Sequence, residues 1–482
     1  MTKRLLVVLA AFVVAYASMA QAVLDASWDD LTPFRAGLVD AGVLSEFEDA
    51  PMYHLRLQLS DDLARVTGTE EVRATNRSDS SWREIVFRLY PNTLGSRLEV
   101  SAARVNAVAV EPVLENQDTV LRLPLPRALA PGDSLVATLH FELRVAREPA
   151  LGYGRLGIYP DVLSLAHGYP ILAVYQHGAW DRAVPPNLAD PTFAVSSLYL
   201  VEVSAPAGQT LVASGQERSR VLDGDRQTVV FAAGPVREFY LASARGYTRQ
   251  SLTLGETTIR SFAPAALSAG AGRALHYAED ALRVYSRRFV RYPYRELDVV
   301  AVPVRAGGIE YPGIINVANS LYDQQRGFFE GVVAHEVAHQ WFYGLIGNDQ
   351  VAEPWLDESF AQYATLLYYL DVRGAAAARS FRASLRADWA DARNHDMAIG
   401  LPATAYTEHS YSPIVYGRGP LFLAELAQDL GQDRLNEILR DYAEHYEFGV
   451  ADTEDFRRLA ETDCACDLGS LFRTWVYPMN AP

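Results

Sequence analysis

The first half of the chain is dominated by short runs in which apolar and polar residues alternate. From about Tyr53 onward these runs include YHLRLQLS, EIVFRLYPN, SLVATLHFELRV and SSLYLVEVSAPAG, and turn residues separate them. Such alternation is typical of strands that bury one face, and its repetition predicts an antiparallel sandwich or barrel. We therefore expect an all-β N-terminal domain over residues 23–246, in which residues 23–52 form a loosely assigned leader.

The pattern changes after Thr257. Residues 271–289 place their apolar side chains at the helical period and predict an amphipathic helix. The segments TTIRSFAP, ELDVVAVPV and IINVA are typical of strands, and a glycine-rich turn, GGIEYPG, precedes the last of them. From Phe328 onward the pattern is mostly helical. Residues 247–482 are therefore predicted to form an α+β domain with a helical C-terminal part.

The N-terminus has the pattern of a secretory signal. Two basic residues, Lys3 and Arg4, precede an apolar run of 13 residues, LLVVLAAFVVAYA, and small residues follow it. The run is short for a membrane span and matches the core of a signal peptide; the alternative is an uncleaved anchor. Cleavage after Ala22 would remove residues 1–22. We expect export to a periplasmic or extracellular space, without stable membrane insertion afterwards.

Composition narrows the class of protein. The 482 residues are 49% hydrophobic and 21% charged, which is the composition of a globular protein of two or three domains. The net charge of -16 repels phosphate groups and argues against nucleic acid as a partner. The only two cysteines, Cys464 and Cys466, are two residues apart, an awkward spacing for a disulfide, so whether they are bridged stays open.

The apolar stretch FFEGVVAHEVAHQWFYG carries the candidate chemistry. His335 and His339 are four residues apart, so on a helix their rings lie on one face and can meet one metal ion. Glu336 lies next to the same point but does not compete for a ligand position. This arrangement is the physical basis of the HExxH motif. The alternative is a core helix whose histidines bond to carbonyls or carboxylates, but Glu336 would then need a partner of its own.

A catalytic zinc site needs a third protein ligand. Glu358 lies 19 residues after His339, in the first turn of a second helical pattern, where an antiparallel helix pair would bring it to the two histidines. Glu353 and Asp357 are competing carboxylates in the same segment.

These motifs resemble the aminopeptidase N family of zinc metallopeptidases, gluzincins in which eighteen residues separate HExxH from a glutamate. Two further segments agree: Gly307 to Tyr311 (GGIEY) resembles the family's Gly-x-Met-Glu-Asn segment, and Tyr416 in SPIVYGRG lies where the family has its catalytic tyrosine. The resemblance covers most of the chain. It implies a sandwich-like β domain followed by a thermolysin-like peptidase domain, in a short form without the family's helical C-terminal domain.

The chain also departs from the family pattern. Ile309 and Tyr311 replace the methionine and asparagine of the exopeptidase segment, while Glu310 is retained. Arg418 replaces a lysine after the tyrosine, and Thr365 stands where an acidic residue often supports the metal ligands.

The resemblance implies a role for each site residue. One zinc ion would be held by His335, His339 and Glu358. Glu336 would act as general base and Tyr416 would stabilise the oxyanion. Substrate would be bound by Glu310, which takes the free amine of a peptide. Gly307 and Gly308 beside it let a substrate backbone approach closely. Gln176, in AVYQHGAW, is a further candidate for contact with the amine, and the alternative is that it lies on a surface loop.

The expected function is a zinc-dependent aminopeptidase that acts on peptides. The alternatives are an endopeptidase or dipeptidase with weak N-terminal selectivity, or a catalytically silent peptide-binding relative. The sequence indicates neither the preferred first residue nor the oligomeric state.

Overall fold

The computed structural model describes residues 25–160, 162–323 and 327–478, which form two compact units. The first consists of the described residues up to Arg182 together with Ser196–Gly246. The second consists of Ala183–Val195 together with the described residues from Tyr247 onward. The second unit thus takes up the chain again at Tyr247, ten residues before the change in sequence pattern at Thr257. The segment Ala183–Val195 groups with the second unit, although the expected N-terminal domain included it.

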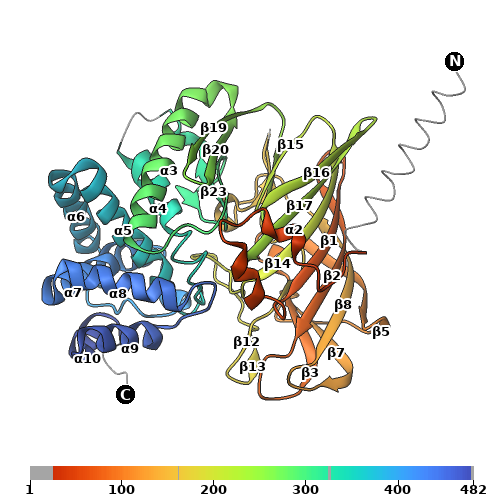
Figure 1. The fold of residues 1–482 in the computed structure, drawn as a ribbon, viewed down its shortest axis with the longest axis horizontal. Coiled ribbons are helices and arrows are strands. Elements are labelled where there is room, and N and C mark those ends of the chain that lie inside the picture. Colours follow the sequence, from red (N-terminus) through yellow and green to blue (C-terminus); the bar gives the residue numbers. More distant parts are fainter. Residues whose placement is uncertain (1–24, 161, 324–326, 479–482) are drawn as a thin grey trace, which may run out of the picture. The chain divides into compact units, whose positions relative to one another are not determined.

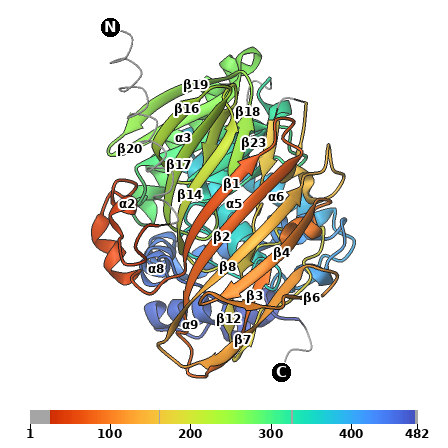
Figure 2. The same ribbon diagram turned by 90° about the vertical axis from the view of Figure 1, so that its right-hand side faces the viewer.

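The first unit is built on an eight-stranded sheet, whose broad face is seen in Figure 2. Two short helical turns, α2 (Thr32–Arg35) and η1 (Ala41–Glu46), occupy the expected leader. In spatial order the strands are β16 (Gln216–Asp223), β17 (Arg226–Val236), β14 (Ser197–Pro206), β1 (Met52–Leu59), β2 (Arg65–Thr75), β8 (Ser134–Arg144), β4 (Arg97–Val105) and β5 (Val108–Val110).

Two four-stranded sheets and a hairpin complete this unit. The first sheet has the order β15 (Thr210–Ala213), β18 (Leu241–Ala244), β10 (Val162–Leu165) and β9 (Leu156–Ile158). The second has the order β11 (Ile171–Leu172), β3 (Trp82–Arg88), β7 (Val120–Leu129) and β6 (Val113–Glu115), and the hairpin joins β12 (Tyr175–Gln176) to β13 (Ala179–Trp180).

The all-β prediction for this region is confirmed, with one difference in topology. In β8 the leucines and Phe141 point to the buried face and alternate with more exposed residues, as the sequence pattern predicts. The central pair β1 and β14, however, is parallel, with Leu55 opposite Val201. A parallel pair needs a long crossover rather than a tight turn, so local alternation alone could not predict it.

The second unit combines a five-stranded sheet with a set of helices (Figure 1). The sheet order is β19 (Tyr247–Leu254), β20 (Thr257–Pro264), β21 (Glu296–Val302), β23 (Ile314–Ala318) and β22 (Gly308–Ile309). The helices are α3 (Ser268–Arg288), α4 (Phe328–Ala338), α5 (Trp355–Arg373), α6 (Ala375–Ala390), α7 (Gly419–Leu430), α8 (Gln432–His445), α9 (Thr453–Cys464) and α10 (Gly469–Trp475), with a π-helical turn, η7 (Ser412–Arg418), before α7. The predicted α+β character is confirmed.

Apolar burial positions the first helices of this unit. Helix α3 buries Leu275, Ala278 and Leu282 on one face, as its periodicity predicts, and packs on β20 and on α4. Helix α4 is apolar on nearly every side and lies between α3, α5 and β23. It is therefore a core helix, and any polar side chain on it is removed from water.

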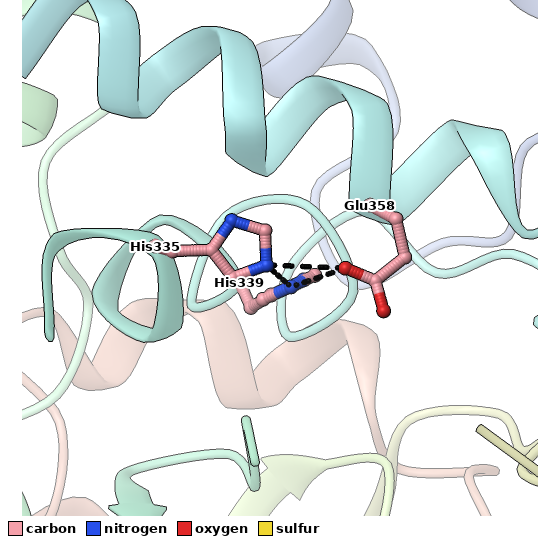
Figure 3. A group of neighbouring side chains, drawn as sticks. All are labelled: His335, His339 and Glu358. Atoms are coloured by element: carbon pink, nitrogen blue, oxygen red, sulfur yellow. Dashed lines mark hydrogen bonds and ion pairs between the residues drawn. The ribbon is translucent and has the colours of Figure 1, made fainter. Parts of the chain in front are cut away.

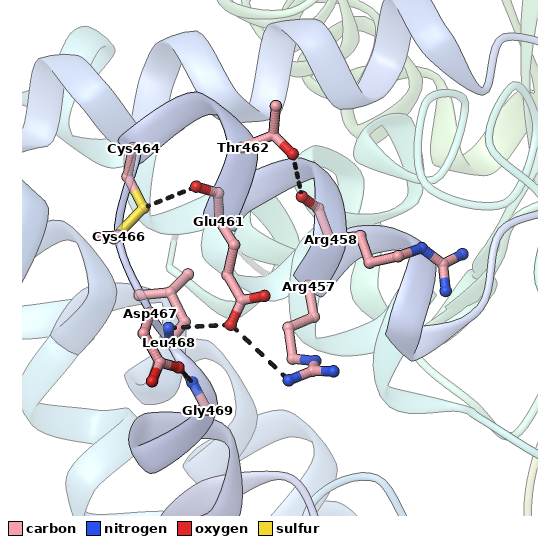
Figure 4. The surroundings of a disulfide bond; sticks show 9 residues. All are labelled: Arg457, Arg458, Glu461, Thr462, Cys464, Cys466, Asp467, Leu468 and Gly469. Atoms are coloured by element: carbon pink, nitrogen blue, oxygen red, sulfur yellow. Dashed lines mark hydrogen bonds and ion pairs between the residues drawn. A yellow bond between two sulfur atoms is a disulfide. The ribbon is translucent and has the colours of Figure 1, made fainter.

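The two cysteines are joined in a disulfide at the end of α9 (Figure 4). Their Cα atoms are 5.2 Å apart, within the range that a disulfide spans. Ala465 between them adopts a left-handed backbone conformation with φ 51° and caps the helix. The question that their spacing leaves open is thus answered in favour of the bridge.

The expected signal peptide, residues 1–22, lies outside the described residues. Among the residues that are described, no helix combines the length and the apolar character that a bilayer crossing needs.

A buried carboxyl group stands out in the first unit. Glu70 on β2 is fully buried, and neither of its carboxyl oxygens has a hydrogen-bond partner among the described residues. Its cross-strand neighbours are Leu55 and Leu139. Burial raises the pKa of Glu70 well above its ordinary value, because a charge in this apolar setting is not compensated.

We predict that Glu70→Gln stabilises the first unit at high pH. A raised folded-state pKa means that the stabilising effect of the proton is complete below the unfolded-state pKa and is lost as the pH rises. Glutamine stays neutral at every pH. At pH 8 the Tm of the variant should therefore exceed that of the unsubstituted protein by at least about 2–4 °C. That is the shift in Tm that about 1 kcal/mol of stability causes in a folding unit of roughly 150–250 residues.

Thermal unfolding between pH 4 and pH 8 checks this prediction. The difference in Tm should shrink toward pH 4. Glu111→Gln makes the same chemical change at an exposed position and should leave the Tm unchanged. A difference for Glu70→Gln that does not vary with pH would contradict the assignment.

Candidate metal centre and active site

Helix α4 carries two of the candidate ligands one turn apart. Its apolar side chains, among them Phe329 and Val333, are buried, and the Tyr285 hydroxyl donates a 3.0 Å hydrogen bond to the Ala334 carbonyl. His335 lies in the last turn of the helix and His339 at its C-cap. Since the helix is held on several sides, the directions of both imidazoles are fixed by the core.

Helix α5 brings the third candidate ligand. The helix begins at Trp355, whose indole packs against Phe360 and Phe422 and donates to the Thr453 hydroxyl at 2.9 Å. Glu358 lies in the first turn of this anchored end and is buried. The predicted helix pair thus forms, with α4 and α5 in contact.

The three ligand atoms converge on one point (Figure 3). The Nε2 atoms of His335 and His339 are 3.0 Å apart, and they lie 3.1 and 3.2 Å from Oε2 of Glu358. Tetrahedral zinc with bonds of about 2.0–2.1 Å requires ligand atoms about 3.3 Å apart. Two nitrogens and one carboxylate oxygen therefore have the chemistry and the spacing that fit this ion.

The backbone orients one of the two imidazoles. Nδ1 of His339 lies 2.9 Å from the Phe342 carbonyl oxygen, to which it donates, so that the lone pair of Nε2 faces the other ligands. Nδ1 of His335 is buried and has no hydrogen-bond partner among the described residues. Thr365, where the family often has an acidic residue, donates instead to the Ala361 carbonyl of its own helix.

The electrostatics of the site call for a cation. Burial, the largest single cause, would raise the pKa of Glu358, but the adjacent imidazoles of His335 and His339 together outweigh burial and lower it. Burial works to lower the pKa of His339, yet the surrounding carboxylates, Glu310 and Glu358 foremost, raise it well above its ordinary value. The centre is thus rich in negative charge, and a divalent cation would compensate it.

The glycine-rich turn lies directly against the proposed base. Strand β22 pairs with β23, which places Gly308 opposite Val317. A Cβ atom on Gly308 would lie 2.5 Å from the carboxyl carbon of Glu336, so only glycine fits without displacing that side chain. Glu310, at the end of the turn, is buried, and its Oε1 accepts a 2.9 Å hydrogen bond from the amide of Gln350.

Tyr416 lies beside the metal ligands on the turn η7. Its hydroxyl donates to Oε1 of Glu358, and its ring centroid is 5.7 Å from that of His335. Ser359, next to Glu358, donates to the Val415 carbonyl at 2.7 Å, and a Cβ atom on Gly419 would overlap the Ser359 hydroxyl. The turn that carries Tyr416 is therefore locked onto the helix that carries the ligand.

Arg418 stabilises the turn η7 through contacts with aromatic rings and backbone carbonyls. Its guanidinium lies over the rings of Trp389 and Trp475 and donates to the carbonyls of Met397 and Thr474. These contacts hold η7 in place.

The remaining candidates have other neighbours. Glu353 accepts from the Thr453 backbone amide at 3.3 Å, at the start of α9. Asp357 faces Gln350 and Asn348. Gln176 lies on the β12–β13 hairpin of the first unit, so its predicted contact with substrate stays a prediction.

Sequence reasoning missed two side chains that the structure places at the site, Gln350 and Ser359. Both lie within ten residues of Glu358, but neither has a residue type that by itself indicates chemistry. Their roles depend on which groups they face after folding.

Comparisons with known proteins agree with this geometry. Residues 273–475 match the family model described as the Peptidase family M1 domain, so the predicted resemblance is confirmed. Aminopeptidase M1-C of Oryza sativa subsp. japonica is 24% identical over 91% of this chain and 50% of its own length. Aminopeptidase N of Lactobacillus helveticus is 27% identical over 70% of this chain and 42% of its own.

The chain spans about half or less of the length of these curated relatives. Among solved structures, the M1 zinc metallopeptidase of Deinococcus radiodurans has a TM-score of 0.67 at 23% identity, and the match covers 90% of this chain and 95% of that one. The match establishes that both units share its fold.

We predict that Glu358→Gln and His335→Ala abolish stoichiometric zinc binding. Each change removes one of three converging donors, and a buried site with two ligands holds the ion poorly. Metal analysis after dialysis should give about one zinc per chain before substitution and below about 0.1 after it.

Glu353→Gln is the matched control, because it alters a nearby carboxylate outside the cluster. It should retain the metal. Equal zinc loss in Glu353→Gln and Glu358→Gln would contradict the ligand assignment.

Proposed function

We propose that this chain is a zinc-dependent aminopeptidase that removes N-terminal residues from peptides. One observation carries the proposal: the metal-type cluster lies together with Glu310, the Tyr416 hydroxyl bonds to its Glu358, and Glu336 is next to His335 on the same helix. A protein that only bound peptides would not need a base and a hydroxyl donor beside a metal centre. The M1 domain match and the names of the curated relatives support the same class of enzyme.

His335, His339 and Glu358 would hold the ion. A zinc ion at this point supplies a Lewis acid that polarises a carbonyl and lowers the pKa of water. Glu336, pressed between Gly308 and the core, takes the proton of the attacking water and delivers it to the leaving amine. Burial, the largest cause, raises the pKa of Glu336, which suits a group that must accept a proton and release it again.

Tyr416 acts on the charge that develops at the carbonyl oxygen. Its hydroxyl already reaches the ligand Glu358, so it lies within a hydrogen bond of the reaction centre. Burial raises the pKa of Tyr416 well above its ordinary value, and the hydroxyl therefore keeps the proton that it must donate.

Glu310 selects the end of the peptide. Its carboxylate receives the substrate's free ammonium, and its fixed distance from the metal centre lets the first peptide bond react. The two replacements in the family segment leave it in place: Ile309 is buried, and the Tyr311 carbonyl is held by the Gln340 amide at 3.1 Å. These contacts hold the turn that carries Glu310.

The cellular site belongs to the same proposal. The basic and apolar pattern at residues 1–22 supports export to the periplasm or the extracellular space, with cleavage after Ala22.

The zinc-loaded protein should hydrolyse aminoacyl amides and unblocked peptides and spare N-acetylated ones. Glu336→Ala should lower kcat by about 10²–10⁴ and Tyr416→Phe by about 10²–10³, both with zinc retained. Steady-state rates on matched free and blocked substrates check this.

Two other outcomes would contradict the aminopeptidase function. Equal cleavage of blocked peptides would indicate an endopeptidase. A zinc-loaded protein without turnover would indicate a silent peptide binder.

Gly308→Ala should be almost as damaging as loss of the base. Its methyl group must displace the Glu336 carboxylate, and a misplacement of about 1 Å can cost on the order of 10² in rate. Gly307→Ala, whose Cβ would meet a Val332 methyl group at 3.0 Å, serves as the matched control and should lose far less kcat. Comparable losses in the two variants would refute the steric argument.

A further inference from the structure

A buried hydrogen-bonded chain links Glu310 to helix α5. The side-chain nitrogen of Gln350 donates to Oε1 of Glu310 at 2.9 Å and to Oδ2 of Asp357 at 2.7 Å. Gln350 is 2% exposed and Asp357 is 1% exposed. We propose that Gln350 is a positioning residue that fixes the Glu310 carboxylate for the substrate's ammonium group. This inference rests on the aminopeptidase function proposed above.

The bridge uses the full donor capacity of the Gln350 nitrogen. A carboxamide has two N–H groups, and here each meets a different carboxylate. Gln350 and both of its acceptors are buried, so water does not compete for these two hydrogen bonds and the amide holds both carboxyl groups. Gln350 therefore ties two segments 40 residues apart, the turn that ends at Glu310 and the approach to α5.

Asp357 supplies a rigid end for this bridge. Its other oxygen, Oδ1, accepts from the Asn348 amide at 3.1 Å, and Asn348 also donates to the Glu353 carbonyl. Asp357 is next to Glu358 in the first turn of α5. Gln350 and Asp357 thus link Glu310 to the helix turn that carries the metal ligand Glu358.

One oxygen of Glu310 stays available. Oε1 is held by Gln350, whereas Oε2 accepts no hydrogen bond from the described residues. Glu310, His339 and Asp357 each offer a ligand atom within 4.8 Å of the other two. An ammonium group bound to the Glu310 carboxylate would therefore lie close to His339 and Asp357, in a position that the bridge sets.

This geometry argues against a second metal ion in that place. Gln350 directs N–H donors at both carboxylates, and a cation bound between them would face these donors. The bridge instead leaves room for a group that brings its own protons, as an ammonium does. Because a glutamate side chain has several rotamers, fixing one of them in advance reduces the entropy that substrate binding would otherwise lose.

The test compares Gln350→Met and Gln350→Glu with the unsubstituted zinc enzyme. Methionine keeps the length and removes both donors; glutamate keeps the shape and polarity and adds a third carboxylate. On an aminoacyl amide we expect KM to rise about tenfold or more with kcat within about threefold, the effect of losing a charge-assisted hydrogen bond. Slow residual cleavage of the N-acetylated substrate should not change, so the preference for free amines falls.

Gln250→Met is the matched control. Its amide also donates two hydrogen bonds within the same unit, to the backbone and side-chain oxygens of Ser268, and its loss should leave both substrates unaffected. Zinc content and Tm are measured for every variant, so that a variant which fails to fold is recognised and the other Gln350 variant decides.

The outcomes separate the two proposals. If the unsubstituted enzyme shows no preference for free amines, the aminopeptidase function itself fails. If it does and both folded Gln350 variants keep that preference, or lose activity on both substrates equally, Gln350 does not position Glu310. More than one zinc per chain would also overturn the inference.

Discussion

The convergence of two imidazoles and one carboxylate is the constraint on which the rest of the second unit depends. Three polar groups within 3.2 Å of one another, all buried, are unfavourable in a protein core unless a cation holds them together. The surrounding fold meets this cost with rigid elements. Helix α4 is enclosed by α3, α5 and β23, and α5 is fixed at its start by Trp355.

Each neighbouring group is then positioned by reference to these two helices. The turn with Gly308 packs on Glu336 of α4, the π-helical turn with Tyr416 is tied to Ser359 of α5, and Glu310 is tied to Asp357 of α5. A reacting group can act only within a few tenths of an ångström of its required position. Attachment to these two packed helices keeps Glu336, the Tyr416 hydroxyl and Glu310 at fixed positions relative to one another.

The residues that depart from the family pattern have contacts of their own in the structure. The Arg418 guanidinium packs on the rings of Trp389 and Trp475, and these cation–π contacts stabilise the turn η7. Thr365 bonds its own helix and leaves His335 without a supporting acceptor among the described residues. The changed residues of the GGIEY turn are buried, and the retained Glu310 is the one that faces the centre.

By itself, the sequence determined the class of fold and the principal chemistry. Alternation of period two and periodicity of 3.6 residues depend on local backbone geometry, so the β and α+β halves were predictable, and the HExxH spacing follows from one helical turn. The ligand Glu358 could be proposed from its place in a second helix, although Glu353 and Asp357 competed with it. Without the family resemblance, only the packing of the two helices shows which of these three carboxylates faces the histidines.

Only the tertiary structure decided the rest. The parallel pairing of β1 with β14, the disulfide between Cys464 and Cys466, and the bridge from Glu310 through Gln350 to Asp357 depend on contacts between segments or on backbone angles at single residues. Local patterns record which face a residue buries, but they do not record which residue it meets there. For that reason the sequence could propose metal ligands and a base, while the side chains that contact them were revealed only by packing.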